Sequence, residues 1–281
     1  MTISELKNSI LAELTKVYPC EEANSFFGLL AEDYLKMSRF ELSLNRENEV
    51  SAADLEKFDR AKERLLKHEP IQHIIGETEF FGLKFKVNSN VLVPRPETEE
   101  LVQWILDDID SEENEIKLLD IGTGSGCIAI SLAKNLPEAK FFAYDISKKA
   151  LETASLNAQT NDVGVNFSEK DILQTDHLEQ QYSHIVSNPP YVRELEKAEM
   201  QANVLKYEPE TALYVKDEDP LIFYRKITEL AQKALRPGGK LYFEINQYLG
   251  TETEKLLQEY GFKTELRKDI YGNFRMLKGE K

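Results

Sequence analysis

The chain has 281 residues, 41% hydrophobic and 30% charged, which is typical of a globular protein of one large or two smaller domains and excludes a disordered chain. Its formal net charge is −15 and it has no basic cluster, so no direct nucleic-acid partner is expected. No apolar run approaches the roughly 18 residues that span a bilayer, no secretory signal begins the chain, and Cys20 and Cys127 lack histidines at metal-ligand spacing; we expect a cytoplasmic protein without a membrane span or a metal.

From Ile3 to about Ile71 the sequence has the three-four spacing of amphipathic helices and no strand pattern. In its first stretch the apolar residues share one stripe, formed by Ile3, Leu6, Ile10, Leu14 and Val17. A later stretch opens on Ser51 as an N-cap and closes before Pro70. Three or four short helices of this kind predict a small helical bundle, which we place at residues 1–75.

Residues 81–93 change to the alternating pattern of β-strands. Phe81, Leu83, Phe85 and Val87 alternate with polar or small residues, and apolar residues resume at 91–93 after the turn sequence 88–90. Alternation on both sides of a turn predicts a β-hairpin. We place a hairpin linker at residues 76–94 and a further domain at residues 95–281.

Strands and helices alternate from about Pro94 onward, which is typical of a doubly wound, mostly parallel sheet of the α/β class. The expected strands are residues 116–122, 140–147, 166–172, 182–190 and 240–246. The expected helices between and after them are residues 127–137, 148–163, 219–239 and 250–262. Residues 263–269 and 273–279 predict a closing antiparallel hairpin.

A glycine-rich loop, Gly122-Thr123-Gly124-Ser125-Gly126, lies between the first buried strand and its helix. Glycines permit positive φ and close approach of a ligand to the backbone, and the helix start offers free N–H groups. The third glycine comes one residue earlier than in the dinucleotide pattern G-x-G-x-x-G, which argues against NAD. Taken alone, the loop equally fits a tight turn in any α/β protein.

Acidic residues end the next two strands. Asp145 follows the loop by about twenty residues, where a carboxylate can accept both hydroxyls of a ribose; its alternative role is the N-cap of the next helix. Asp171 ends the third strand, where an adenine amino group would be read, and its alternative role is a cap or turn residue. Ile172 would then pack on the adenine ring.

The fourth strand runs directly into Asn188-Pro189-Pro190-Tyr191. Prolines cannot donate to a sheet ladder, so the strand ends there and places these groups at its carboxyl end, where open α/β sheets bind ligands. The Asn188 side-chain oxygen and the Pro189 carbonyl can accept one hydrogen bond each from the two N–H groups of a planar NH₂ group. The Tyr191 ring can stack on the plane of that group. The sequence offers no separate general base. The alternative is a simple strand-ending turn.

The loop, the two acids and the Asn-Pro-Pro-Tyr turn, in this order, resemble the class I S-adenosylmethionine-dependent methyltransferases. The tetrapeptide resembles the subset that methylates planar nitrogens, namely adenine amines or side-chain amides. The resemblance implies S-adenosylmethionine as the cofactor, with the glycine loop at its methionine part, and S-adenosylhomocysteine as the product.

Residues 70–102 are similar to the peptide chain release factor glutamine methyltransferases, with Pro94-Arg95-Pro96-Glu97-Thr98-Glu99 close to a family signature. The stretches "YEPETAL" and "LRPGGKLYFEI" also lie where members carry similar text, so the resemblance covers nearly the whole chain. It implies an N-terminal helical domain for substrate recognition, a hairpin linker and a catalytic domain. It also implies N5 methylation of the glutamine in the Gly-Gly-Gln loop of class 1 release factors.

The resemblance assigns roles residue by residue. It implies cofactor contacts at Gly122, Thr123, Gly124, Ser125, Gly126, Asp145, Asp171, Ile172 and Asn188. It implies a substrate site at Asn188, Pro189, Pro190 and Tyr191, with Asn188, Pro189 and Tyr191 as the catalytic residues. The chain departs from the family at Ile172, where some relatives have an aromatic residue, and at Phe274, where many have an acid, so no role is carried over to Phe274.

Three other functions stay open at this point. A ribosomal-protein glutamine is an alternative substrate within the same enzyme class. An adenine-N6 methyltransferase shares Asn-Pro-Pro-Tyr, but it must extract a base and grip phosphates, which the charge of −15 opposes. A non-catalytic cofactor-binding scaffold would bind the cofactor without turnover, and the intact Asn188 and Tyr191 argue against it.

Overall fold

The computed structural model describes residues 1–109, 115–199 and 202–281. The chain forms two compact units: a helical unit of Met1–Gly76 with Gln201–Tyr207, and a sheet unit of Glu77–Met200 with Glu208–Lys281. Buried apolar residues of four helices, at Ile3–Leu14, Cys20–Leu35, Ala52–Leu65 and Ile71–Ile75, build the core of the helical unit together with Val50. The sheet unit has two large core clusters and one small one of its own. None of the described helices is both long and apolar enough to cross a membrane.

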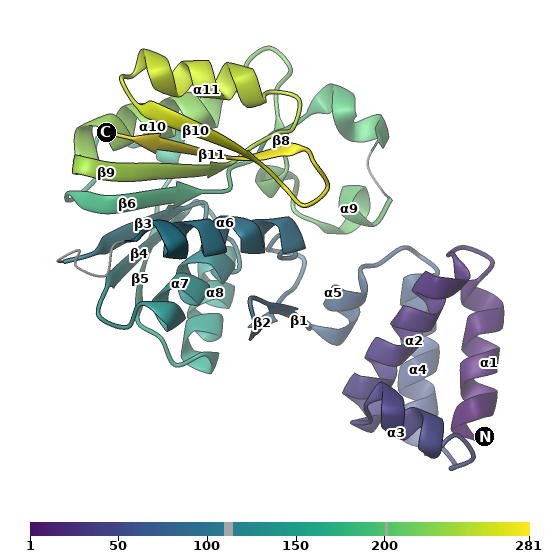
Figure 1. The fold of residues 1–281 in the computed structure, drawn as a ribbon. Coiled ribbons are helices and arrows are strands. Elements are labelled where there is room, and N and C mark those ends of the chain that lie inside the picture. The colour runs from purple at the N-terminus through teal and green to yellow at the C-terminus, as the bar shows by residue number, and fades with distance from the viewer. Residues whose placement is uncertain (110–114, 200–201) are drawn as a thin grey trace. The chain divides into compact units, whose positions relative to one another are not determined.

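Short helices make up the helical unit (α1 to α5 are purple to blue in Figure 1): α1 (Ile3–Leu14), α2 (Cys20–Leu35), α3 (Arg39–Leu44), α4 (Ala52–Leu65), α5 (Ile71–Ile75) and α9 (Ala202–Tyr207). The predicted stripe on α1 is buried except for Val17, which lies beyond the helix end and is 42% exposed. Ser51 caps α4 by accepting a hydrogen bond from the Asp54 N–H, as predicted. Helix α9 was not predicted; Tyr207 in it donates to the Lys67 carbonyl at 3.0 Å.

A seven-stranded sheet organises the sheet unit: β3 (Lys117–Ile121), β4 (Lys140–Asp145), β5 (Val165–Glu169), β6 (Tyr182–Ser187), β9 (Leu235–Glu244), β10 (Lys263–Lys268) and β11 (Phe274–Glu280). The strand order is β10-β11-β9-β6-β3-β4-β5, with the last five parallel and β11 antiparallel to both its neighbours. The doubly wound sheet and its closing hairpin are confirmed. One boundary differs, because β9 takes in residues 235–239, which we expected at the end of a helix.

Helices cover both faces of this sheet (Figure 1): α6 (Pro96–Asp108), α7 (Cys127–Asn135) and α8 (Lys148–Thr160) on one face, α10 (Ile222–Ala234) and α11 (Gly250–Glu259) on the other. Successive strand residues point to opposite faces. Leu118 therefore packs in the core beside α6 and α7, whereas Leu119 packs in the core beside α10. Burial on both faces explains why the central strands are almost continuously apolar.

The predicted hairpin is present, but its turn was placed wrongly. Strands β1 (Glu77–Phe80) and β2 (Leu83–Lys86) pair antiparallel and turn at Phe81 and Gly82, not at residues 88–90, and residues 91–93 are not a strand. Phe81 and Gly82 have φ angles of 50° and 72°. A two-residue hairpin turn of type I′ requires positive φ at both central residues. Phenylalanine rarely adopts positive φ, so no residue pattern indicated this turn.

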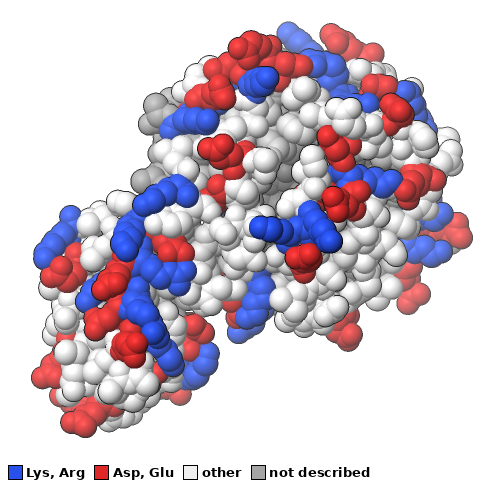
Figure 2. All heavy atoms as spheres, turned by 180° about the vertical axis from the view of Figure 1, so that it is seen from behind, with Lys and Arg blue, Asp and Glu red and all other residues white. Residues whose placement is uncertain are grey.

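The segment between β6 and α10 was not predicted. It contains β7 (Val192–Arg193) and β8 (Tyr214–Val215), which pair in parallel, and the short 3₁₀ helices η2 (Glu194–Glu199) and η3 (Glu210–Ala212). Figure 2 shows Lys and Arg side chains interspersed with Asp and Glu side chains over the face that it displays.

Candidate active site

The order of the parallel strands reverses at β3. The chain continues from β3 to β4 and β5 on one side, and then returns to place β6 on the other side of β3. In open α/β sheets this switch point leaves a crevice outside the carboxyl ends of the two strands. A cavity of about 360 Å³ lies there, within the range of small-molecule sites. Residues 90–98, the glycine loop, the ends of β4 and β5, the Asn-Pro-Pro turn and residues 209–214 contribute to its lining.

The glycine loop shapes one wall of the cavity. Gly122 and Gly124 have positive φ angles of 76° and 55°, and both line the cavity with Thr123 and Ser125. The Gly122 and Thr123 N–H groups both donate to the Tyr144 carbonyl, at 2.8 and 3.0 Å. A side chain on Gly122 would have its Cβ only 4.0 Å from the Asn188 carbonyl oxygen. The loop and the Asn188 turn are therefore close neighbours.

The third glycine of the loop has a different role. Gly126 does not line the cavity; a Cβ on it would lie 2.7 Å from the Ile130 side chain and 3.2 Å from the Ala154 Cβ. Gly126 therefore lets the start of α7 pack closely against α8, which is a known use of a glycine at this place in nucleotide-binding loops. Its expected contact with a cofactor stays a prediction.

Asp145 lies at the end of β4 and faces the glycine loop. Its carboxylate oxygens accept hydrogen bonds from the Gly124 N–H and the Ser147 N–H, both at 2.8 Å. Burial raises the pKa of Asp145 above its usual range. The N-cap of α8 is Ser147, so the alternative role of Asp145 as the cap is wrong. Each carboxylate oxygen keeps a further lone pair, and Asp145 lines the cavity.

Asp171 and Ile172 follow β5, the strand next to β4, which ends at Asp145. Asp171 caps η1 (Ile172–Gln174) by accepting from the Leu173 N–H at 2.9 Å, so its capping role is confirmed. Both residues line the cavity, and the buried Ile172 packs into the core cluster that includes Tyr144. Recognition of an adenine edge by Asp171 stays a prediction.

The Asn-Pro-Pro turn forms the wall that faces the glycine loop. Asn188, Pro189 and Pro190 all line the cavity. Asn188 is half-buried, and its side-chain amide makes no hydrogen bond within the described part of the chain. This amide can therefore pair with a ligand.

Tyr191 takes an orientation that the sequence did not predict. It is not among the residues that line the cavity; its ring packs against the core and its hydroxyl donates to Glu244 at 3.0 Å. Burial raises the pKa of Tyr191, so its hydroxyl stays protonated. Stacking of this ring on a substrate stays a prediction, and the observed contacts give Tyr191 a structural attachment behind the turn.

The sequence left two roles open for residues 94–99, a rigid linker that caps the next helix or a border of the cofactor pocket, and two of these residues do line the cavity, with partners that were not predicted. Arg95 lines the cavity and donates to the buried Glu208 at 2.5 Å, which fastens the start of residues 208–214. Burial raises the pKa of Glu208 even though Arg95 lowers it. Thr98 also lines the cavity, and its hydroxyl donates to the buried Glu244 at 2.6 Å. The prolines beside Arg95 and Glu208 were visible in the sequence, but nothing in it indicated the pairing.

The cavity combines three kinds of group. It has a carboxylate acceptor at Asp145, exposed backbone beside positive-φ glycines, and a planar amide acceptor and donor at Asn188. Between them lie apolar side chains such as Ile121, Ile128 and Ile172. Within residues 1–109, 115–199 and 202–281, no group of three or more His, Cys, Asp or Glu side chains is arranged to hold a metal ion. The set suits a ligand with a hydroxylated, partly apolar body.

Family models match two parts of the chain. A PrmC N-terminal domain model matches residues 6–76, and a methyltransferase small domain model matches residues 98–213. A release factor glutamine methyltransferase of Flavobacterium psychrophilum is 53% identical over 99% of both chains. One of Bacteroides thetaiotaomicron is 46% identical over 95% of this chain and 96% of that protein.

A solved structure supports the fold alone. The crystal structure of a methyltransferase from Pyrococcus furiosus matches with a TM-score of 0.53 and 20% identity, and covers 79% of this chain and 98% of that one. With the match of the methyltransferase small domain, the predicted class I methyltransferase fold is confirmed.

Proposed function

The chain belongs to the release factor glutamine methyltransferase family and is a methyltransferase enzyme, and from this premise we propose that it methylates the side-chain nitrogen N5 of the glutamine in the Gly-Gly-Gln loop of class 1 release factors. The proposed methyl donor is S-adenosylmethionine, and the other product is S-adenosylhomocysteine. One observation carries the proposal: the Asn188 amide borders a nucleoside-sized cavity beside the glycine loop and has no partner within the described chain.

The residues around the cavity fit this donor. When bound, S-adenosylmethionine supplies an electrophilic methyl group on a positively charged sulfur. Asp145 offers carboxylate oxygens to two ribose hydroxyls, as in other doubly wound nucleotide sites. Ile172 offers an apolar surface to the adenine, and the backbone at Gly122 and Gly124 leaves room for the amino-acid part.

Asn188 and Pro189 would hold the glutamine. The Asn188 side-chain oxygen accepts one N–H of the carboxamide, and the Pro189 carbonyl accepts the other. As the N–C bond forms, the bond between the methyl carbon and sulfur breaks and its electron pair stays on sulfur. Positive charge then grows on the N–H groups and both acceptors bind more strongly, which favours the transition state; the nitrogen afterwards releases one proton to solvent. Fixed proximity of nitrogen and methyl carbon contributes about 7–11 kcal/mol at best.

The remaining assignments follow from the same proposal. The helical domain of residues 1–75 recognises the release factor, and the hairpin linker of residues 76–94 joins it to the catalytic domain of residues 95–281. Tyr191 and Pro190 complete the substrate site. The enzyme acts in the cytoplasm, where its substrate takes part in translation termination.

Labelled S-adenosylmethionine tests the substrate directly. The enzyme is incubated with a release factor and, separately, with the same factor carrying Gln→Ala in its Gly-Gly-Gln loop. We expect label only in the unaltered factor, at the loop peptide. Equal label in both factors would remove the substrate assignment, and label in neither would remove the proposed function.

Asn188→Ala tests the site. We expect the affinity for S-adenosylhomocysteine to stay within about threefold, whereas kcat falls by at least about 100-fold because the nitrogen is no longer oriented. Asn166→Ala on the edge strand β5 is the matched control, since Asn166 is exposed and bonds only to the Phe141 carbonyl within the described chain. A near-normal kcat in Asn188→Ala would contradict the assigned role.

A further inference from the structure

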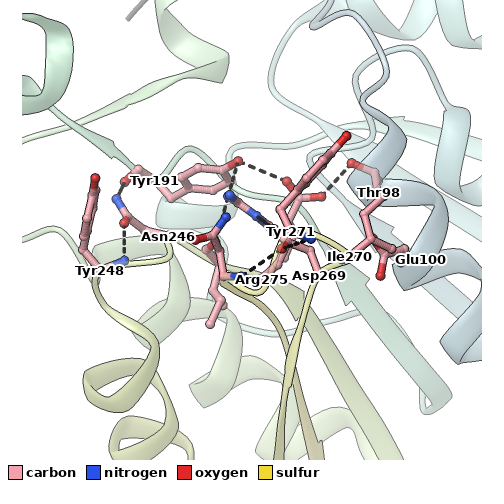
Figure 3. Close-up of polar contacts among 12 residues, drawn as sticks. Thr98, Glu100, Tyr191, Asn246, Tyr248, Asp269, Ile270, Tyr271 and Arg275 are labelled. Carbon is pink, nitrogen blue, oxygen red and sulfur yellow. Dashed lines mark hydrogen bonds and ion pairs between the residues drawn. The ribbon is translucent and has the colours of Figure 1, made fainter. Parts of the chain in front are cut away.

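A carboxylate lies in the core directly behind the candidate active site. Glu244, the last residue of β9, is only 2% exposed. One of its oxygens accepts from the Thr98 hydroxyl at 2.6 Å and the other accepts from the Tyr191 hydroxyl at 3.0 Å. Thr98 and Tyr191, both labelled in Figure 3 with their hydrogen bonds dashed, belong to different elements. Both donors come from segments that border the cavity.

The two donors come from two different segments that border the cavity. Thr98 lies in the first turn of α6 and lines the cavity itself. Tyr191 directly follows Asn188, Pro189 and Pro190, which line the cavity. The carboxylate of Glu244 therefore connects the start of α6 to the end of the Asn-Pro-Pro turn, although Thr98 and Glu244 are 146 residues apart in the chain.

Tyr191 is held at its other polar groups as well. The Arg275 guanidinium lies with Nη1 3.5 Å from the Tyr191 hydroxyl, and its Nε lies 3.4 Å from Asp269 (Figure 3). The Asn246 side chain donates to the Tyr191 carbonyl at 2.9 Å. Tyr191 is thus fixed at both its hydroxyl and its backbone. These contacts hold the Tyr191 side chain in one orientation, and thereby restrain the preceding residues 188–190.

A buried carboxylate is a costly choice for a purely structural contact. Taking its charge out of water costs free energy, and burial accordingly raises the pKa of Glu244. Apolar residues of similar size often stabilise a core as well or better. Unlike an apolar residue, the carboxylate orients its neighbours, because it accepts hydrogen bonds from two hydroxyls at short distance and with a preferred geometry.

We propose that Glu244 is a positioning residue for methyl transfer, which orients the Asn188–Tyr191 turn against the start of α6 by accepting the hydroxyls of Tyr191 and Thr98. The inference rests on the proposed function of the same site. Glu244 touches neither donor nor glutamine; it acts through Tyr191. Its loss displaces the acceptors at Asn188 and Pro189 and leaves the ribose side of the cavity, at Asp145, intact.

Three variants of the full-length enzyme test this role. Glu244→Gln keeps the shape and one acceptor, Glu244→Leu removes both acceptors, and Tyr191→Phe removes the hydroxyl that connects the turn to Glu244. Asp108→Asn is the matched control, because Asp108 also accepts a tyrosine hydroxyl, that of Tyr242 at 3.0 Å, but at the far end of α6. Asp108 does not line the cavity.

Three readouts separate positioning from general stability: kcat with the release factor, the Kd of S-adenosylhomocysteine, and amide hydrogen exchange of residues 185–193 with S-adenosylhomocysteine bound. A displacement of about 1 Å can cost about 100-fold in rate, so we expect kcat to fall by about 100-fold in Glu244→Leu and by about tenfold in Glu244→Gln and Tyr191→Phe. The Kd should stay within about threefold, and exchange of residues 185–193 should become faster in all three variants. Asp108→Asn should keep kcat and this exchange within about twofold of wild type, even where its stability falls.

Several results overturn the inference. A kcat within about twofold of wild type in both Glu244 variants would reduce the residue to a stability contact. If the Kd of S-adenosylhomocysteine rises as much as kcat falls, Glu244 acts on binding of the methyl donor. If hydrogen exchange of residues 185–193 is unchanged, Glu244 does not position the turn. If wild-type enzyme leaves the release factor unlabelled, the proposed function fails, while the exchange comparison still decides whether Glu244 holds the turn. Because Glu244→Gln is isosteric, it decides the question if Glu244→Leu does not fold.

Discussion

The Ser187 hydroxyl donates a hydrogen bond of 2.6 Å to the Ile121 carbonyl and so joins the carboxyl ends of β6 and β3. These are the two strands between which the cavity opens. Ile121 precedes the glycine loop and Ser187 precedes Asn188, and Ser187 is completely buried. This bond therefore adds to the pairing of β3 with β6 at its carboxyl end, between the two walls that we assign to the methyl donor and to the glutamine.

Ser187→Ala should weaken both stability and catalysis. Removal of the hydroxyl leaves a buried carbonyl with one partner fewer, which costs about 1–3 kcal/mol of unfolding free energy. Urea unfolding measures this loss, and kcat should fall with it because the walls can move apart. Ser131→Ala is the control: Ser131 is equally buried, and its hydroxyl has no partner in the described structure, so its loss should be close to neutral. Equal effects of the two variants would contradict this role of the Ser187 hydroxyl.

Asp145→Asn should chiefly weaken donor binding. Hydrogen bonds to a charged group contribute about 1.5–3 kcal/mol, so the Kd of S-adenosylmethionine should rise by about ten- to 100-fold in isothermal titration calorimetry. Since burial raises the pKa of Asp145, wild-type affinity should also fall as the pH is lowered toward that raised pKa, and the Asn variant should lack this dependence. Glu169→Gln is the control, because the exposed Glu169 lies opposite Asp145 in the adjacent strand. Unchanged affinity in Asp145→Asn would exclude ribose contact.

Asp120 should make the stability depend on pH. Burial raises its pKa from 3.8 to about 7, while the Thr123 hydroxyl donates to it at 2.6 Å. Between these two values the folded state holds a proton that the unfolded state has lost, so unfolding free energy falls as the pH rises through this window. Each pKa unit corresponds to about 1.4 kcal/mol, which gives at most about 4 kcal/mol.

Asp120→Asn removes this titration and keeps an oxygen for Thr123. We expect the difference in unfolding free energy between variant and wild type to grow in favour of the variant from about pH 4 to about pH 7. Parallel pH profiles of the two proteins would show that Asp120 does not titrate in this window. Asp176→Asn is the control, because the exposed Asp176 side chain remains in contact with solvent in the folded state. Its substitution should leave the pH profile of the unfolding free energy unchanged.

The site residues that lie at the carboxyl ends of strands could be predicted from the sequence. The carboxyl ends of parallel strands meet at one edge, so the glycine loop, Asp145, Asp171 and Asn188 could be brought together from their order alone. The sequence did not predict contacts between distant segments. Arg95 and Glu208 are 113 residues apart, and neither lies on a strand whose pairing the pattern could indicate. Glu208 lies in a stretch of sequence, residues 192–215, that lacks a regular apolar period, so the pattern could not predict where Glu208 lies.

Side-chain direction was the second limit. Tyr191 was expected over the substrate because its place in the motif was known, but its hydroxyl could also reach inward to a carboxylate. The sequence contains Glu244 without indicating that it is buried behind this turn. The hairpin turn at Phe81 was missed for a related reason, since a positive φ at phenylalanine depends on tertiary contacts. One such contact is the hydrogen bond from the Phe81 N–H to Glu99.

Two glycines of the loop should fail in different ways when changed to alanine. Gly126→Ala brings a Cβ to 2.7 Å from the Ile130 side chain at a φ of 83°, so clash and backbone strain should together cost about 2–4 kcal/mol of unfolding free energy. Gly124→Ala meets nothing within 4 Å at a φ of 55°, so strain alone should cost about 1 kcal/mol.

Donor binding should show the opposite order. Gly124 lines the cavity, so the methyl group and the backbone strain of its alanine variant should raise the Kd of S-adenosylmethionine by about tenfold, which corresponds to about 1.4 kcal/mol. Gly126→Ala, assayed where it is still folded, should raise it less, because Gly126 lies between α7 and α8. Urea unfolding and calorimetry on the same two variants measure both orders. A larger loss of affinity in Gly126→Ala would mean that the third glycine contacts the donor, contrary to its packing against Ile130 and Ala154.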